Sequence, residues 1–319
     1  MSTQPSADSS ASVQITALDP NPQTVSELTA LAKAAADHDG DPPFSDQTLV
    51  QLRTAAHTTT VVGALLEDSQ RMVGAAVVVH SDQPDTAAVL EAVVDPAHRG
   101  SGTGAAMVTA ALDGGVGDHA AMDAWAHGDH AAARALATTL GFTPVRELHR
   151  LLRPMTGVTD ELALRLPPGL ALRAFEVGVD EEAWLAVNAA AFADHPEQGR
   201  MTMSDLRERE AEDWFDPQGF LIAHPVGDPR EIAGFHWTKV HPATHREPAR
   251  GEVHVVGIAP DQQGRGLGKA LTVAGLHHLA QRGLQEVLLY VDAQNTAAFN
   301  LYRALGFEPW HVDVMFSRR

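Results

Sequence analysis

The 319-residue sequence contains no cysteine, which excludes disulfide bonds, thiolate zinc sites and a cysteine nucleophile. Aromatic residues make up only 5% of the chain, so aliphatic side chains and alanine must form most of the core. Lys and Arg total 23 against 41 Asp and Glu, and this formal charge of −18 argues against nucleic acid or anionic membranes as partners. No apolar run approaches the roughly 18 residues of a membrane-spanning helix. We expect a cytoplasmic globular protein, and a monomer.

Two parts of the chain repeat one another. When Pro96 is aligned with Pro260, Gly102 falls on Gly266 at an offset of 164 residues. Further on, the string LGFTP at 140–144 matches LGFEP at 305–309 at an offset of 165. Two motifs in the same order and at nearly the same spacing predict two structural copies.

Each copy shows the same succession of predicted elements. Short apolar runs bounded by turn residues predict strands at 61–66, 72–79 and 89–94, and again at 219–223, 232–237 and 252–258. After a Gly-rich segment come a helix, a strand and a helix, at 104–112, 121–126 and 131–140, and again at 268–282, 286–291 and 296–305. A last strand closes each copy. This alternation predicts a mixed α/β (α+β) fold in two tandem domains.

The domain boundaries are expected where turn residues gather. Pro154 and the Pro167–Pro168–Gly169 break predict a linker at 153–170, between domains at 13–152 and 171–319. Residues 1–12 are polar and lack the charged and apolar regions of a signal peptide, so we expect a disordered tail there.

One Gly-rich segment has the properties of a pyrophosphate cradle. The sequence QGRGLG at 263–268 leads directly into an apolar-periodic helix. Glycines let the backbone turn tightly and direct several N–H groups to one point, and the helix start adds partial positive charge. Arg265 adds a charge at the rim. The spacing fits neither the Rossmann fingerprint nor a P-loop, and a plain strand-to-helix turn is the structural alternative.

This segment, with its surroundings, resembles the acetyl-CoA motif Q/R-x-x-G-x-G/A of the GNAT superfamily of N-acetyltransferases. Apolar residues 255–258 precede the loop, Asn295 opens a later helix, and Ala298, Tyr302, Gly306 and Phe307 form the pattern A-x-x-x-Y-x-x-x-G-F. The first copy carries RGSGTG at 99–104, which fits the same motif.

A narrower resemblance covers nearly the whole second copy. The strings AAFADHPEQG (190–199), FHWTKVHP (235–242) and LLYV (288–291), with WAHG (125–128) and VREL (145–148), are similar to the mycothiol synthase family. That family acetylates the cysteinyl amine of Cys-GlcN-Ins, a cysteinyl aminosugar, to give mycothiol. The resemblance thus implies acetyl-CoA as co-substrate and a small-molecule acceptor.

The resemblance also implies roles for individual residues. Glu252 would be the general base, directly or through water, and Tyr302 would protonate the departing CoA thiolate. Acetyl-CoA would contact Val256, Gly257, Ile258, Gln263, Gly264, Arg265, Gly266, Leu267, Gly268, Lys269, Asn295, Thr296, Ala297, Ala298, Phe299 and Asn300 in the second copy, and Ala92, Val93, Val94, Gly100, Ser101, Gly102, Thr103, Gly104 and Ala105 in the first. The acceptor would contact Asp46, Glu197, Lys239, Glu252 and Tyr290. The structural alternatives are a strand-edge Glu252, a helix-bracing Tyr302 and a solvated strand-end Lys239.

The repeat provides an internal comparison. At these offsets Tyr302 falls on Ala137, Asn295 on His130 and Glu252 on Ala88. The first copy is therefore expected to bind acetyl-CoA or CoA without catalysing transfer.

Other signals carry little weight. His241 and His245 have the i,i+4 spacing of a metal pair, but Pro242 favours a loop, so no metal is expected. The segment 37–41 faintly resembles a calcium loop but lacks the later Glu of an EF-hand. Two other functions stay open: acetylation of another amine, such as an aminoglycoside, polyamine or peptide amine, and a catalytically silent CoA sensor.

Overall fold

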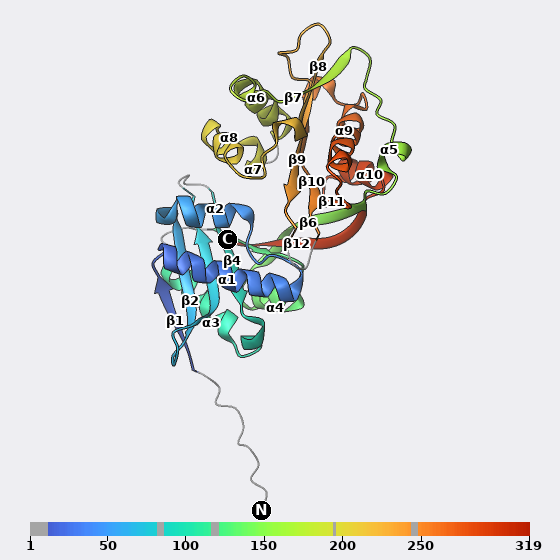
Figure 1. Ribbon diagram of the computed structural model, residues 1–319. Helices are drawn as coiled ribbons and strands as arrows, with labels where there is room; N and C mark the ends of the chain where they lie inside the picture. The colour runs from blue at the N-terminus through green and yellow to red at the C-terminus, as the bar shows by residue number, and fades with distance from the viewer. Residues whose placement is uncertain (1–11, 82–85, 116–120, 194–195, 244–247) are drawn as a thin grey trace, which may run out of the picture. The chain divides into compact units, whose positions relative to one another are not determined.

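The computed structural model describes residues 12–81, 86–115, 121–193, 196–243 and 248–319, and the chain is divided into two compact units (Figure 1). Unit 1 consists of residues 1–148 and 311–319, and unit 2 of residues 149–310. Each is an α/β unit, as the repeat predicts, and each is considered by itself below.

Unit 1 is built on a sheet in the order β1-β2-β3-β4-β5-β12. Its strands are β1 (Val13–Leu18), β2 (Thr59–Leu66), β3 (Met72–Val79), β4 (Ala88–Val94), β5 (Met122–Ala126) and the end of β12 (Glu308–Arg318). Neighbours from β1 to β4 are antiparallel, β4 and β5 are parallel, and β12 is antiparallel to β5. Its helices are α1 (Pro22–Asp39), α2 (Asp46–Thr54), α3 (Thr103–Gly115) and α4 (Ala131–Thr139).

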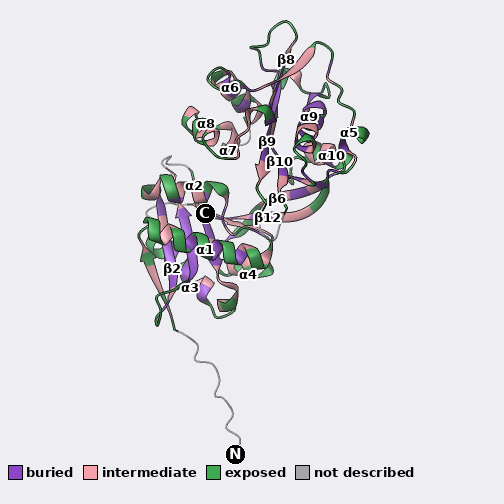
Figure 2. Cartoon of the chain, in the orientation of Figure 1, coloured by how far each residue is buried: buried purple, intermediate pink, exposed green. Residues whose placement is uncertain are grey.

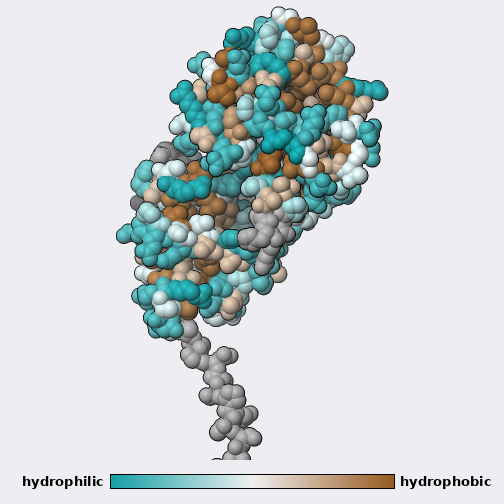
Figure 3. All heavy atoms as spheres, in the orientation of Figure 1, coloured by the Kyte–Doolittle hydropathy of each residue, from teal (hydrophilic) through white to brown (hydrophobic). Residues whose placement is uncertain are grey.

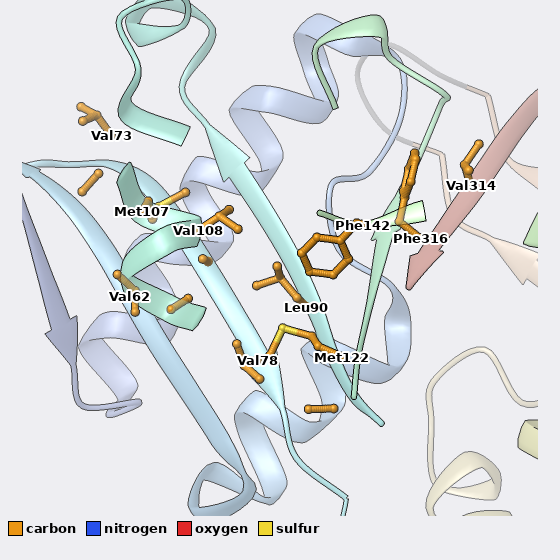
Figure 4. Close-up of a cluster of buried hydrophobic side chains, with 14 of the residues drawn as sticks. Val62, Val73, Val78, Leu90, Met107, Val108, Met122, Phe142, Val314 and Phe316 are labelled. Atoms are coloured by element: carbon orange, nitrogen blue, oxygen red, sulfur yellow. The ribbon is translucent and has the colours of Figure 1, made fainter. Parts of the chain in front are cut away.

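The two faces of this sheet bury separate apolar clusters. On one face, Met107 and Val108 of α3 pack on Val62, Val78 and Leu90. On the other, a cluster centred on α1 covers alternate residues of the same strands, as the period of two along a strand requires. Figure 4 shows the α3 side.

Unit 2 repeats this arrangement with the order β6-β11-β10-β9-β8-β7. Its strands are the end of β6 (Thr143–Pro154), β7 (Leu170–Ala174), β8 (Phe220–Pro225), β9 (Gly234–His241), β10 (Arg250–Ile258) and β11 (Glu286–Asp292). Its helices are α5 (Val158–Glu161), α6 (Glu181–Ala191), α7 (Pro196–Gly199), α8 (Met203–Glu210), α9 (Leu267–Gln281) and α10 (Thr296–Ala304). Strands β7 to β10 are antiparallel, and β10 is parallel to β11.

Helices cover both faces of the unit 2 sheet, and the strands between them are largely buried (Figure 2). Trp184 of α6 and Leu206 of α8 pack on Phe220 and Trp237. On the opposite face, α9 and α10 pack on β10 and β11. Eight of the chain's 17 Phe, Trp and Tyr residues belong to the cluster on the α6–α8 side.

The last strands of the two repeats are exchanged, which corrects the expected domain split. The final residues 311–319 belong to unit 1, where Val314 and Phe316 join the core, and Figure 4 shows Phe316 beside Phe142. Burial of each such side chain contributes about 1.5–3 kcal/mol, so the chain end is held in unit 1. The unit boundary falls between Leu148 and His149 rather than in the expected linker.

The expected linker at 153–170 is instead part of unit 2. Met155 and Val158 are buried in the same cluster as α9 residues, and the Leu162 carbonyl accepts a hydrogen bond from His277 Nε2 at 2.8 Å. The predicted strands and helices of both repeats are confirmed to within a few residues. The sequence patterns do not predict β1, β7, α1, α2, α5, α6, α7 and α8.

The visible surface carries hydrophilic side chains interspersed with hydrophobic ones (Figure 3). Among the described residues, no helix is long and apolar enough to cross a membrane. The predicted tail at 1–12 falls almost entirely outside the described residues.

Candidate active site

In unit 2, β10 and β11 pair over three residues and then separate. Residues 251–253 pair with 287–289 in parallel register, while β10 continues to Ile258 against β9 alone. Among the described strands, the backbone groups on the β11 side of residues 254–258 therefore have no partner. Fixed N–H donors of this kind suit a carbonyl oxygen on which negative charge develops.

The Gly-rich loop follows directly from this strand. Gly264 and Gly266 have φ angles of +75° and +84°, the left-handed region that glycine adopts without strain. Gly266 is the N-cap of α9, so the first N–H groups of the helix face the loop. A Cβ at either glycine would meet nothing within 4 Å, which leaves open space for phosphate groups beside these N–H donors. The residues fit a pyrophosphate.

Unit 1 has the same backbone design with less positive charge. Its strands β4 and β5 pair at 88–90 with 122–124 and then separate, and Gly100 and Gly102 have φ angles of +77° and +87°. Ser101 stands where unit 2 has Arg265, and Arg99 donates hydrogen bonds to Asp39 at 2.8 and 2.7 Å. The Arg99 hydrogen bond outweighs desolvation and lowers the pKa of Asp39 to about 2, so this arginine is already neutralised.

One extra residue, His254, interrupts the pairing of β10 with β9. Val253 pairs with Thr238 and Val255 pairs with Trp237, so His254 forms a β-bulge at the point where β10 leaves β11. The equivalent strand of unit 1, β4, pairs with β3 without any interruption. His254 therefore has no counterpart in unit 1.

The bulge also corrects the alignment of the two repeats. From the equivalent pairs Gly74–Val94 and Gly234–Ile258, the ladders run back to Val79–Val89 in unit 1 and Lys239–Glu252 in unit 2. Glu252 therefore corresponds to Val89, not to Ala88, because the inserted residue shifts the offset by one. Unit 1 still has no carboxylate at the place of Glu252.

Glu252 is buried and bonded through both carboxylate oxygens. Its side chain is 7% exposed; Oε1 lies 2.8 Å from His254 Nδ1 and Oε2 lies 2.5 Å from His241 Nε2. Desolvation raises the pKa of this carboxyl, but the charge of His254 and the hydrogen bonds of both histidines outweigh it and hold the pKa well below its usual value. Glu252 is therefore ionised at neutral pH.

Aromatic rings and a lysine surround this group. The ring centroids of Trp214 and Trp237 lie 5.3 and 5.5 Å from that of His254, both edge-on. Lys239, which pairs with Glu252 across the ladder, is 8% exposed and places Nζ 4.9 Å from the Trp214 centroid. Predicted substrate residue Lys239 thus lies beside predicted base Glu252.

Tyr302 lies on the other face of the sheet. It belongs to the α9–α10 cluster with Val253, and Glu252, the preceding residue of that strand, points the opposite way. Tyr302 is 9% exposed, and burial raises the pKa of its hydroxyl to about 12. Within the described residues this hydroxyl has no hydrogen-bond partner, so its proton is available to a sulfur atom.

The other predicted contacts fall in three places. Tyr290, 40% exposed, is the first residue of β11 beyond the paired segment. Asn295 caps α10 through its Oδ1, which accepts from the Ala298 N–H at 3.0 Å, and residues 296–300 form the first turns. Asp46 is exposed at the start of α2 in unit 1. Glu197 lies in α7, but its side chain is outside the described part of the chain, as is residue 245.

Sequence reasoning missed the histidines around Glu252. His254 follows Glu252 by two residues on one strand, which places both on one face and is a signal that the sequence contains. A second buried group was also missed: in unit 1, His127 bonds to both Glu91 and Asp313, which are far apart in sequence. No group of three or more ligands that could hold a metal occurs among the described residues.

The model of the acetyltransferase (GNAT) family matches residues 26–142 and again 184–307. The chain belongs to the GNAT acetyltransferase family. This acetyltransferase therefore uses acetyl-CoA as co-substrate, and the two matched segments account for the repeat.

Named relatives show which acetyltransferases this chain resembles in sequence. It is 53% identical to the mycothiol acetyltransferase of Kocuria rhizophila over 91% of the chain and 94% of the relative. Identity is 50% with that of Thermobispora bispora (91% and 95% covered) and 47% with that of Streptomyces coelicolor (92% of each).

Solved structures share the fold of this acetyltransferase. A tandem GNAT protein from the clavulanic acid biosynthesis pathway matches with a TM-score of 0.71 at 19% identity, over 96% of this chain and 98% of that one. A superfamily N-acetyltransferase from Sphaerobacter thermophilus gives 0.68 at 24% identity, over 95% of each chain. These likenesses show the tandem fold alone.

Proposed function

We propose that this acetyltransferase transfers acetyl from acetyl-CoA to the cysteinyl amine of Cys-GlcN-Ins, which gives mycothiol. The observation that carries the proposal is its 46–53% identity, over nine tenths of the chain, to several mycothiol acetyltransferases. The unit 2 site supports it, because an ionised carboxylate, two imidazoles and a lysine lie together on one face of the sheet beside the separated strands, and a buried tyrosine lies on the other face.

Each group of unit 2 has a part in this reaction. Acetyl-CoA supplies a thioester carbon that an amine can attack. The free N–H groups on the β11 side of residues 254–258 hold the carbonyl oxygen, and the loop at 263–268 holds the pyrophosphate. Glu252 and the two histidines bonded to it face the acceptor from one side of the sheet, and Tyr302 faces the sulfur from the other side.

Burial suits Tyr302 to the acid role. A pKa of about 12 keeps its proton in place at neutral pH, and a thiolate emerging in the same apolar surroundings is also poorly solvated. A hydrogen bond from the hydroxyl then stabilises the thiolate before the proton moves. The polar side chains of Lys239 and Tyr290, on the Glu252 side, are proposed to bind the aminosugar.

Unit 1 is proposed to bind acetyl-CoA or CoA without catalysis. Val89 and Ala137 stand at the places of Glu252 and Tyr302, so neither a base nor an acid is supplied there. Its loop keeps the two left-handed glycines but lacks the charges of Arg265 and Lys269.

The test is a product analysis with purified protein, acetyl-CoA and Cys-GlcN-Ins, beside a panel of other amines. Mass spectrometry must be the readout, because the acceptor has its own thiol and would react with a thiol dye. One added acetyl group on the cysteinyl nitrogen, with strong preference over the panel, is expected. If only other amines are acetylated, the acceptor is one of those amines and not Cys-GlcN-Ins. Binding of acetyl-CoA without any turnover would favour the catalytically silent CoA sensor.

A further inference from the structure

Because Glu252 is buried, its carboxylate is poorly placed to take the proton directly from the amine. Both oxygens are already bonded to imidazole nitrogens, and only 7% of the side chain is exposed. A carboxylate with a pKa far below neutral is also a weak proton acceptor. A proton from outside reaches this carboxylate most directly through one of its two histidines.

The geometry distinguishes the two histidines. His241 pairs with Arg250 at the end of β10 that lies away from the loop. His254 is the bulge residue itself, at the point where β10 leaves β11 and where the N–H groups for the acetyl carbonyl begin. His254 therefore lies nearer to the reacting carbon.

Glu252 also fixes which nitrogen of His254 carries the proton. An ionised carboxylate only accepts hydrogen bonds, so Nδ1, at 2.8 Å, must be the donor in the neutral ring. Nε2 then carries the lone pair, and within the described residues nothing bonds to it. Trp214 and Trp237 hold the ring edge-on, which limits its rotation. This is the arrangement of an oriented general base.

We propose that His254 is the catalytic base of this acetyltransferase and that Glu252 is the residue that orients it. The inference rests on the proposed acetyl transfer. His254 Nε2 takes one proton from the neutral amine as the nitrogen bonds to the acetyl carbon. Tyr302 gives its proton to the sulfur as the sulfur–carbon bond breaks with its electron pair on sulfur. Solvent then returns the proton from the imidazolium to the tyrosinate.

The test compares His254→Asn with His241→Asn. An asparagine amide in place of the His254 ring can replace Nδ1 as donor to Glu252 but offers no counterpart of Nε2, so folding should be preserved. For His254→Asn we expect kcat to fall about 100-fold or more, with the KM for acetyl-CoA within about 3-fold of wild type, loss of the acidic limb of the pH–rate profile, and partial rescue by added imidazole. His241→Asn should lose less than about 10-fold and keep the limb.

The pH profile has identifiable contributors. Titratable groups around His254 are Glu252 on its own strand and His241, Lys239 and His236 on β9, and none of them changes in this variant. Glu212 and Asp213, next to Trp214, are exposed.

Two outcomes would overturn the proposal. One is a His254→Asn enzyme with wild-type kcat and pH profile; the other is an inactive variant that keeps the wild-type melting temperature and acetyl-CoA Kd and that imidazole does not rescue. Wild-type enzyme serves as the separate check on the proposed function. If wild type ignores Cys-GlcN-Ins but acetylates another amine, the acceptor is wrong, and the same variants are compared on that amine.

Discussion

His127 Nδ1 lies 3.3 Å from Asp313 Oδ2, and this contact joins the end of β5 to the last strand of the chain. The other ring nitrogen, Nε2, lies 3.0 Å from Glu91 Oε1, and Glu91 in turn accepts a hydrogen bond from the Ser45 N–H at the N-cap of α2. A buried imidazolium between two carboxylates thus holds the exchanged strand in unit 1.

This contact predicts a pH-dependent stability. Burial opposes the charge of His127, but Asp313 and Glu91 outweigh it and raise its pKa from 6.5 to about 9. A raised pKa contributes stability that is complete below about pH 6.5 and is lost as the pH rises through 9, on the order of 3 kcal/mol. The melting temperature of wild type should fall over this window.

The His127→Gln variant should lose most of this fall in melting temperature with rising pH. It should also melt at a lower temperature than wild type at pH 6.5, as calorimetry across pH 6 to 10 would show. The exposed His57 supplies the matched variant, and His57→Gln should leave the curve unchanged. An unaltered slope in His127→Gln would contradict the assignment.

Gly275 in α9 is predicted to be required for close packing, so that even alanine at this position destabilises the protein. A Cβ at Gly275 would overlap the ring of His236, which is fully buried and whose Nδ1 bonds to the Leu271 carbonyl. We expect Gly275→Ala to reduce the free energy of unfolding by about 1–3 kcal/mol. Gly114 of α3 is the control, because a Cβ there meets nothing within 4 Å. In urea unfolding, Gly114→Ala should leave the free energy of unfolding unchanged or raise it by up to about 1 kcal/mol. Equal effects at both sites would refute the packing argument.

The two tyrosines are predicted to affect different kinetic constants. Tyr302→Phe removes the proton donor on the sulfur side, so kcat should fall by about 100-fold while KM for acetyl-CoA changes little. Tyr290→Phe removes the hydroxyl of a side chain that is 40% exposed on the acceptor side, and should raise the acceptor KM several-fold with kcat retained. Steady-state kinetics with each substrate varied would decide, and an unchanged kcat in Tyr302→Phe would remove it from the mechanism.

The paired glycines of the two loops separate the roles of the units. At Gly266 and Gly102 the φ angles are +84° and +87°, and a Cβ meets open space at both, so alanine introduces the same backbone strain of about 1–2 kcal/mol. Gly266→Ala should raise the KM for acetyl-CoA about tenfold. Gly102→Ala should leave turnover at wild-type level and weaken only a second CoA-binding event in calorimetry. Loss of turnover in a folded Gly102→Ala protein would assign catalysis to unit 1 as well.

Much of this arrangement follows from local sequence. The repeat, the strand–loop–helix order and the loop glycines could be predicted because apolar periodicity and left-handed backbone are properties of short segments. Asn295 as a helix start is confirmed for the same reason, since capping uses only the next few residues. The roles assigned to Glu252, Tyr302 and the substrate residues come from resemblance and stay predictions.

Tertiary structure decided the rest. The sequence could not place Val314 and Phe316 in the core of unit 1 or bring Asp313 to His127, because strand pairing across more than 180 residues leaves no local pattern. It also could not show the bulge at His254, since an extra residue in a strand is visible only against the partner strand. Sequence alone determined that two copies of one fold are present and where each loop turns. Long-range pairing decided which strand completes each sheet and which imidazoles enclose the buried carboxylate.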